Sequence, residues 1–131
     1  MNLTLKSVSR KDYRFLYDLL KNRNPKENIS HRDMPTYREH LEFVKNHTYK
    51  RYYIVYKNNI RVGRVYITDK NEIGISLLKK YSRLKRILFK NFSFHPFVKF
   101  ANVSSRNKLD QKILKDLGYK IIQYTYENIS A

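Results

Sequence analysis

The stretch from Tyr52 to Ile67 constrains the fold of this chain most strongly. Tyr52–Tyr56 is a run of β-branched and aromatic residues, Asn58-Asn59 is turn material, and Arg61–Ile67 is a second such run. β-Branched and aromatic side chains favour strands, and asparagine tolerates the left-handed backbone of a two-residue hairpin turn. The stretch therefore predicts a β-hairpin, the best-defined element of the sequence.

Segments with helix and strand patterns surround this hairpin. Ser9 and Thr36 each precede an acidic residue by three positions, a spacing typical of helix N-termini, and the helices they begin are expected to end near Asn22 and His47. A basic stretch at about Leu84–Phe92 is also expected to be helical. The other predicted elements are strands at Leu3–Val8, Glu72–Leu78, Phe97–Val103 and Tyr119–Tyr126, and a helix at Asn107–Leu117.

The predicted helix at Asn107–Leu117 carries its apolar residues on one face and is followed by Gly118, the usual residue of a helix C-terminal cap. Its core-facing residues are expected to be Leu109, Ile113, Leu114 and Leu117. The complete order is β-α-α-β-β-β-α-β-α-β. We therefore expect a single α/β domain over residues 1–131, with a mixed central β-sheet flanked by helices.

Composition excludes several classes of protein. The chain has no cysteine, so disulfides and thiolate chemistry are excluded. No apolar run approaches the ~18–20 residues that span a bilayer, and the first residues lack the apolar core of a signal peptide. The four histidines have no cysteine partners and no metal-binding spacing, so no metal is predicted. We expect a soluble, cytoplasmic protein with no membrane partner.

The chain is strongly basic. It has 28 Lys and Arg against 11 Asp and Glu, a net charge of +17. Between Ile73 and Leu109 there are nine basic residues and no acidic one. This imbalance predicts attraction to a phosphate-bearing ligand, a nucleic acid or an acidic protein surface, while ordinary solvated surface charge is an equal alternative. Six of these residues lie within twelve positions and are called the basic cluster: Lys79, Lys80, Arg83, Lys85, Arg86 and Lys90.

Tyrosine is abundant, with 12 residues in the chain. Five of them lie in or beside the hairpin, among lysines and arginines: Tyr49, Tyr52, Tyr53, Tyr56 and Tyr66. Such a pattern is found where single-stranded nucleic acid stacks on a sheet. Strand tyrosines also pack in cores and at dimer faces, so a homodimer formed through sheet edges or tyrosine-rich faces is a further hypothesis.

The element order and several segments resemble the small N-acetyltransferases of the GNAT family. The resemblance covers nearly the whole chain and includes the ending Leu117-Gly118-Tyr119. It implies a GNAT fold and acetyl transfer from acetyl-CoA to an amine. The segments that carry it are residues 28–36, 52–55, 61–63, 71–75 and 116–127.

The resemblance also assigns roles to individual residues. It implies that Glu72 is the base that takes a proton from the amine, directly or through water; the alternative is an exposed charge at a strand edge. The pantetheine arm of acetyl-CoA would pair with the backbone of Ser76, Leu77 and Leu78. His31 lies where the family places acceptor-binding residues, although loop histidines are more often plain surface residues.

Two family features are missing. The glycine-rich loop that grips the CoA pyrophosphate corresponds to Tyr81–Ile87, which has no glycine, and the proton-donating tyrosine corresponds to Leu114, which is expected in the core. The resemblance is therefore to a degenerate member, and the sequence leaves its enzymatic activity open. The alternatives are a non-enzymatic basic domain that binds nucleic acid or an acidic partner, and a structural homodimer. Charged side chains that would hold phosphates in place of the loop are Lys79, Arg83, Lys85 and Arg86.

Overall fold

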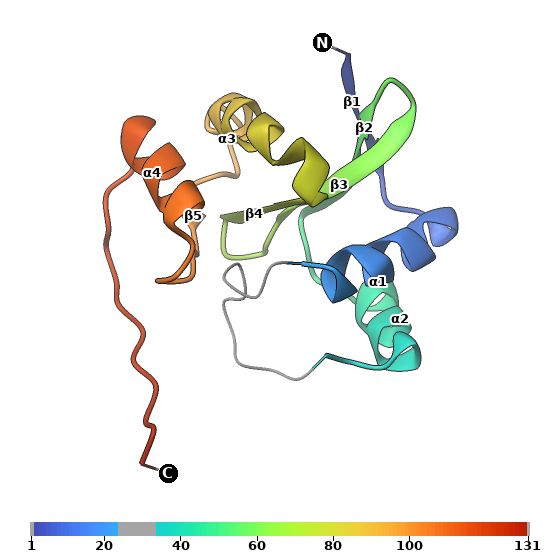
Figure 1. The fold of residues 1–131 in the computed structure, drawn as a ribbon, viewed down its shortest axis with the longest axis horizontal. Coiled ribbons are helices and arrows are strands. Elements are labelled where there is room, and N and C mark those ends of the chain that lie inside the picture. Colours follow the sequence, from blue (N-terminus) through green and yellow to red (C-terminus); the bar gives the residue numbers. More distant parts are fainter. Residues whose placement is uncertain (1, 24–33, 131) are drawn as a thin grey trace.

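The computed structural model describes residues 2–23 and 34–130 and shows a five-stranded sheet with helices on both faces (Figure 1). The strand order is β1-β2-β3-β4-β5. Neighbours from β1 to β4 are antiparallel, whereas β5 is parallel to β4, so the sheet is mixed as predicted. The strands are β1 Leu3–Ser7, β2 Arg51–Lys57, β3 Ile60–Ile67, β4 Glu72–Leu77 and β5 Phe100–Ala101.

The predicted hairpin is confirmed. β2 and β3 are joined by Asn58 and Asn59, whose φ angles are 49° and 69°. Both residues are thus left-handed, the conformation that a tight hairpin turn needs to match the twist of its strands. A register shift between Val55 and Tyr56 lets β3 place both Val62 and Val65 on the same side of the sheet.

Both predicted capping boxes are present. The Ser9 N–H donates to Asp12 Oδ2 at 2.8 Å, and the Thr36 N–H donates to Glu39 Oε1 at 2.8 Å. These contacts satisfy backbone N–H groups that the first helical turn leaves without partners. The helices are the 3-10 helix η1 Arg10–Asp12, α1 Tyr13–Lys21, α2 Tyr37–Lys45, the 3-10 helix η3 Lys79–Leu84, α3 Lys85–Phe92 and α4 Lys108–Asp116.

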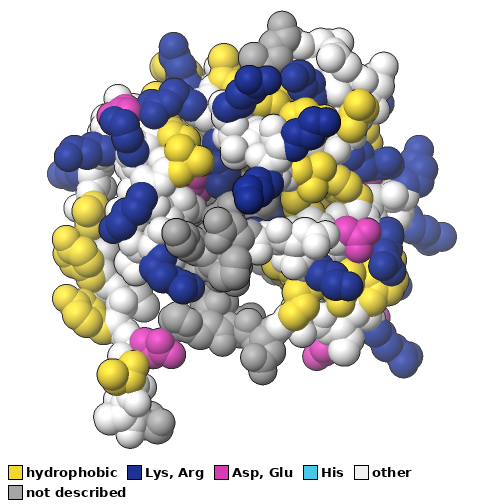
Figure 2. All heavy atoms as spheres, viewed as in Figure 1, with side chains coloured by type: hydrophobic (Ala, Val, Ile, Leu, Met, Phe, Trp, Pro, Cys, Tyr) yellow, Lys and Arg dark blue, Asp and Glu magenta, His cyan; other side chains and the backbone are white. Residues whose placement is uncertain are grey.

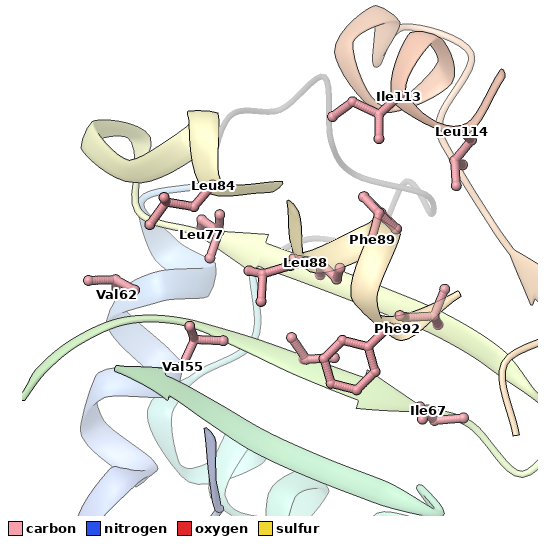
Figure 3. Packing of buried hydrophobic residues seen from close by; sticks show 13 residues of the cluster. Val55, Val62, Ile67, Leu77, Leu84, Leu88, Phe89, Phe92, Ile113 and Leu114 are labelled. Atoms are coloured by element: carbon pink, nitrogen blue, oxygen red, sulfur yellow. The ribbon is translucent and has the colours of Figure 1, made fainter. Parts of the chain in front are cut away.

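The two faces of the sheet have separate cores. α1 and α2 cover one face, where Leu16 and Val44 pack on Tyr52 and Ile54 of β2. η3, α3 and α4 cover the opposite face, which holds the larger core. Figure 3 shows the α3 side chains of this core lying over the strands. Its labelled residues are Val55, Val62, Ile67, Leu77, Leu84, Leu88, Phe89, Phe92, Ile113 and Leu114.

Three predictions for the C-terminal part are wrong. β5 covers only Phe100–Ala101 instead of Phe97–Val103, and Tyr119–Tyr126 is not a strand of the sheet. In Figure 1 this last segment leaves α4 and runs alone to the C-terminus. Leu109 is 49 % exposed rather than in the core. The residue pattern of a strand shows only that its side chains favour extended backbone. Strand pairing also requires a neighbouring strand edge, which the pattern does not reveal.

Candidate functional site

The strands β4 and β5 diverge soon after they begin. Their pairing is confined to Glu72↔Phe100 and Ile73↔Ala101, and a small cavity opens beyond it. The cavity has a volume of about 30 Å³, the space of a single water molecule, whereas pockets for drug-sized ligands measure about 300–1,000 Å³. It is lined by Arg23, Tyr66, Ile73, Gly74, Ile75, Ser76, Phe89, Ala101, Asn102, Val103, Asn107 and Asp110.

Gly74 makes room for one wall of this cavity. A Cβ atom at position 74 would collide with the ring of Tyr66 on the neighbouring strand β3. Tyr66 in turn stacks on Tyr49, with ring centroids 4.5 Å apart and planes 12° apart. The Arg64 guanidinium lies 5.0 Å from the centre of the Tyr66 ring and donates a hydrogen bond to the Tyr52 hydroxyl at 3.1 Å. A packed aromatic cluster thus closes the α1/α2 side of the cavity.

A second, larger hollow lies between the η3–α3 segment and α4. Its volume is about 340 Å³, and Ser82, Arg83, Arg86, Leu109 and Ile113 line it. The exposure of Leu109 follows from this position, because the residue forms the apolar wall of an open hollow rather than part of the core. The hollow combines two cationic side chains with two apolar ones, a lining suited to a group that carries phosphate.

A buried ion pair lies beside the small cavity. Lys85 Nζ lies 3.0 Å from Asp110 Oδ1 and donates to Oδ2 at 3.1 Å, and the two residues are only 3 % and 6 % exposed. Asp110 lines the small cavity, while the flanking Leu109 and Ile113 line the larger hollow. The pair therefore links α3 to α4 at the edge of the small cavity. Removing one partner would leave an uncompensated buried charge, which typically costs about 3–5 kcal/mol.

The N-terminus of α3 is not an open anion site. η3 runs directly into α3, and the Lys85 N–H donates to Ser82 O. At the start of η3 the Tyr81 N–H donates to Leu78 O at 2.8 Å. Backbone N–H groups that a glycine-rich loop would turn toward a pyrophosphate are thus used within the helices.

The backbone at Ser76–Leu78 is where the pantetheine arm of acetyl-CoA would pair. The Leu78 N–H donates to Val62 O at 2.8 Å, and Leu77 pairs with Gly63, so part of the β4 backbone is already engaged. The cavity beside Ser76, at about 30 Å³, has room for a water molecule, so in the described arrangement it does not hold the thioester end of acetyl-CoA.

Glu72 holds the sheet edge together. Its Oε1 accepts from the Thr68 hydroxyl at 3.0 Å, and its Oε2 accepts from Asn102 Nδ2 at 2.7 Å. The carboxylate thus ties the β3–β4 turn to the segment after β5. Glu72 does not line either hollow. Its role as a base stays a prediction.

The other predicted site residues lie in different surroundings. Ser76 is buried beside the small cavity, and Leu77 belongs to the core. Lys79 is exposed on η3. Arg83 and Arg86 line the larger hollow, and Arg86 also lies 3.1 Å from Asp116. His31 lies outside the described residues, which contain no cluster of three or more His, Asp or Glu able to hold a metal ion.

Sequence reasoning missed Asp110. It precedes Ile113 and Leu114 by three and four positions, so it shares their core-facing side of α4. A carboxylate at such a position signals a buried cation, because an unpaired charge is too costly there.

The hairpin tyrosines are less exposed than the nucleic-acid stacking hypothesis requires. The residues are Tyr49, Tyr52, Tyr53, Tyr56 and Tyr66, and all of them are buried or half-buried.

Two histidines belong to the aromatic cluster on the α1/α2 side. Burial lowers the pKa of His40, and the positive charge of Arg64 lowers it further. Its Nδ1 has no hydrogen-bond partner among residues 2–23 and 34–130. Burial also lowers the pKa of His47, whose Nδ1 accepts from the Tyr49 N–H at 3.1 Å. The surroundings of both side chains thus favour the neutral imidazole.

In the part of the chain that the structure describes, no helix combines the length and apolarity that crossing a membrane requires. No family model and no curated protein matches the sequence.

Solved structures match it closely in shape. A domain from Methanocaldococcus jannaschii has a TM-score of 0.72 at 20% identity, over 97% of this chain and 94% of that one. Spermidine N-acetyltransferase from Vibrio cholerae, in complex with CoA and spermine, has a TM-score of 0.70 at 19% identity, over 88% of this chain and 79% of that one. A dodecameric structure of the Vibrio cholerae enzyme scores 0.64 at 17% identity, over 97% and 84% of the two chains.

The likeness confirms the architecture. The five-stranded mixed sheet flanked by helices is shared over most of the chain with N-acetyltransferases of known structure. At these identities the likeness concerns the fold alone. The chain has the fold of the GNAT N-acetyltransferases.

Proposed function

We propose that this chain is a GNAT-fold domain that binds nucleic acid through its basic surface and does not transfer acetyl groups. The observation that carries the proposal is the small cavity beyond the β4–β5 pairing, which at about 30 Å³ has room for a water molecule and has the Lys85–Asp110 pair buried beside it. An acetyltransferase must hold the thioester of its cofactor at such a site, whereas a binding domain has no need of it. The scaffold is then retained for the surface that it presents.

The basic cluster supports a polyanionic ligand. Lys85 is neutralised in the interior, but the five other members are exposed: Lys79, Lys80, Arg83, Arg86 and Lys90. Arg86 shares the Asp116 carboxylate with Lys112, so two cations meet one acid there. Figure 2 shows Lys and Arg side chains spread over one face of the molecule, with few acidic ones among them. Phosphates that approach such a surface release their counterions, which drives binding.

The same charge argues against a polyamine substrate. Polyamines are polycations, and a protein of net charge +17 repels them. In the small cavity, the carboxylate among the described lining residues is that of Asp110, which Lys85 neutralises. The spermine in the Vibrio cholerae structure therefore gives no guide to the ligand of this chain.

The test is binding of a fluorescently labelled oligonucleotide, single- or double-stranded, across a range of salt concentrations. The affinity is expected to fall steeply with salt, with a logarithmic slope of about 0.9 for each duplex phosphate contacted. The variant Lys79→Glu/Lys80→Glu/Arg83→Glu removes three exposed cations and is expected to reduce both affinity and slope. The buried Lys85 is left unchanged, because its reversal would destabilise the fold.

The matched control reverses three exposed cations on the opposite side of the sheet, in Arg10→Glu/Lys11→Glu/Lys21→Glu. This control has the same net charge as the cluster variant. Binding that is lost equally in both variants would reveal attraction to total charge without a defined surface. Absence of binding in the unmodified protein at low salt would also contradict the proposal.

Acetyl transfer to an amine is the second candidate, favoured by the divergence of β4 and β5 and by buried Ser76 at the resulting cavity. It requires the small cavity to widen beyond its volume of about 30 Å³, the phosphates to be held by Lys79, Arg83 and Arg86, and Glu72 to act as the base. Calorimetric titration with acetyl-CoA, with ATP as the control for phosphate attraction, separates the candidates. Saturable one-to-one binding that is tighter than ATP would contradict the binding-domain proposal, and Glu72→Gln would then be expected to reduce turnover.

A further inference from the structure

The segment after α4 exposes an unusual amount of apolar surface. Ile121, Ile122 and Tyr124 are 73%, 66% and 73% exposed, and Tyr126 is 89% exposed. Exposed apolar residues that lie close together mark surfaces that contact another protein. Tyr119 still packs against the core, whereas residues 120–130 are all exposed.

The residues of this segment prefer a strand. Residues 119–126 are mostly isoleucine, tyrosine and threonine, which favour extended structure. In that conformation successive side chains alternate, so Ile122, Tyr124 and Tyr126 share one face. The segment nevertheless pairs with no strand of the described sheet. It is a strand-forming sequence that lacks a neighbouring strand.

The sheet has an open edge that also lacks a neighbouring strand. β5 is the last strand in the order β1-β2-β3-β4-β5, so its outer side pairs with no described strand. Phe100 on β5 is 44% exposed. Unpaired edges with exposed apolar side chains readily add another strand.

The direction in which the chain leaves α4 keeps the C-terminal segment away from the β5 edge within one copy. Gly118 has φ of +96°, a turn that glycine adopts easily. Tyr119 is then fixed on both sides, because its N–H donates to Leu114 O at 2.9 Å and its hydroxyl lies 2.8 Å from Ser93 Oγ. From there the segment runs away from β5 and alongside no other element (Figure 1).

We propose that two copies of this chain exchange residues 120–127, each pairing with the β5 edge of the other. Every copy carries both an open edge and a strand that needs one, so the two halves of the contact are identical and the assembly closes at two. Eight extended residues reach about 26 Å, more than the length of β5 and its flanks. The exchange covers the exposed isoleucines and tyrosines of both copies.

The salt dependence of this dimer distinguishes it from nucleic-acid binding. Two copies of charge +17 repel each other, and residues 120–127 include one lysine and one glutamate, so the exchanged segment does not offset this repulsion. Salt screens this repulsion and strengthens apolar contacts, so the dimer tightens as salt rises. Nucleic-acid binding weakens with salt. The dimer does not rest on that proposed function, and failure of one leaves the other standing.

The first test is sedimentation equilibrium of the full chain, with Ile122→Lys as the disrupting variant. The unmodified chain is expected to sediment at twice the monomer mass, and the variant to raise the dimer dissociation constant on the order of a hundredfold or more. Ile60→Lys is the matched control, because Ile60 is 56% exposed at the start of the central strand β3 and not on the β5 edge. A monomer at all concentrations, or equal weakening by both substitutions, would overturn the proposal.

The second test uses disulfides, since the chain has no cysteine of its own. Phe100→Cys is mixed under oxidising conditions with Ile122→Cys, Tyr124→Cys or Tyr126→Cys. Exchange predicts a disulfide between the two different chains for at least one combination. The same pairs of cysteines placed in a single chain at high dilution show where the segment folds: a link within the monomer would mean that it returns to its own β5, and the proposal would be wrong.

Discussion

The first four strands and the region after them differ in how their elements are held together. In β1 to β4 each strand is followed along the sheet by an antiparallel neighbour and paired over most of its length. After β4, pairing is limited to two residue pairs with β5, a charge pair is buried, and the final segment adds to no described strand. In the first region β2, β3 and β4 pair across short turns, whereas the second region depends on contacts between distant residues.

The difference follows from chain connectivity. β2, β3 and β4 are antiparallel neighbours joined by short turns, so Asn58 and Asn59 suffice to bring β2 and β3 together, whereas β1 is connected to β2 through α1 and α2. A parallel neighbour requires a crossover, here η3 and α3, and its position depends on how that crossover packs. We therefore expect the second region to respond more strongly to substitutions at its long-range contacts.

The largest expected effect comes from breaking the buried pair. Lys85→Met leaves Asp110 charged and unpaired in the interior, so the free energy of unfolding should fall by about 3–5 kcal/mol. Lys85→Met/Asp110→Leu removes both charges and should restore most of this loss. Urea denaturation monitored by circular dichroism measures both. A single variant as stable as the unmodified chain would mean that the pair is not buried in solution.

A smaller effect on stability is expected from removing one helix cap in each of the two regions. Asn107 Oδ1 accepts from the Asp110 N–H at 3.1 Å in a buried position, whereas the Thr36 cap of α2 is exposed. Asn107→Ala should cost about 1–2 kcal/mol, because it leaves a buried N–H without a partner, and Thr36→Ala about 0.5–1 kcal/mol. The same urea measurement applies. Equal losses in the free energy of unfolding would show that burial does not increase the contribution of the α4 cap to stability.

The smallest effect concerns pH and the aromatic cluster beneath α1 and α2. The pKa of His40 is lowered in the folded state by burial and by Arg64, so the unfolded chain binds a proton first, near its ordinary pKa of about 6.5. The free energy of unfolding should therefore be constant above that pH and fall as pH drops through it. The pKa of His47 is lowered as well and contributes in the same direction.

Urea denaturation at pH 7.5 and pH 5.5 tests this dependence. His40 packs against the rings of Tyr17 and Phe43, so His40→Phe keeps an aromatic ring in place and removes the titrating group. The loss of stability between the two pH values should become smaller in this variant. An unchanged pH dependence would assign the effect to other groups.

Local elements were predictable to different degrees. The hairpin, both capping boxes and the Gly118 cap were predicted correctly, because each depends on residues a few positions apart. Leu114 was also placed correctly in the core. The length of β5, the position of Leu109 and the pairing of Tyr119–Tyr126 were not, since each depends on which other element lies beside it.

The candidate site was predictable only in part. The sequence places Ser76 on β4 and a basic cluster after it, and in the structure Arg83 and Arg86 do line one hollow together. The same pattern counted Lys85 with them as a phosphate ligand, although its ammonium turns inward to Asp110. A run of like charges does not reveal which member faces the core.

By itself the sequence determined the net charge, the lack of glycine at residues 81–87 and the local turns and caps, because these depend on composition and on near neighbours. Only the tertiary structure decided that Lys85 meets Asp110, 25 positions away, and that Glu72 meets Asn102, 30 positions away. It also decided that the final segment leaves its own sheet. Contacts of this kind arise from how whole elements pack against one another, and no pattern within a single element specifies them.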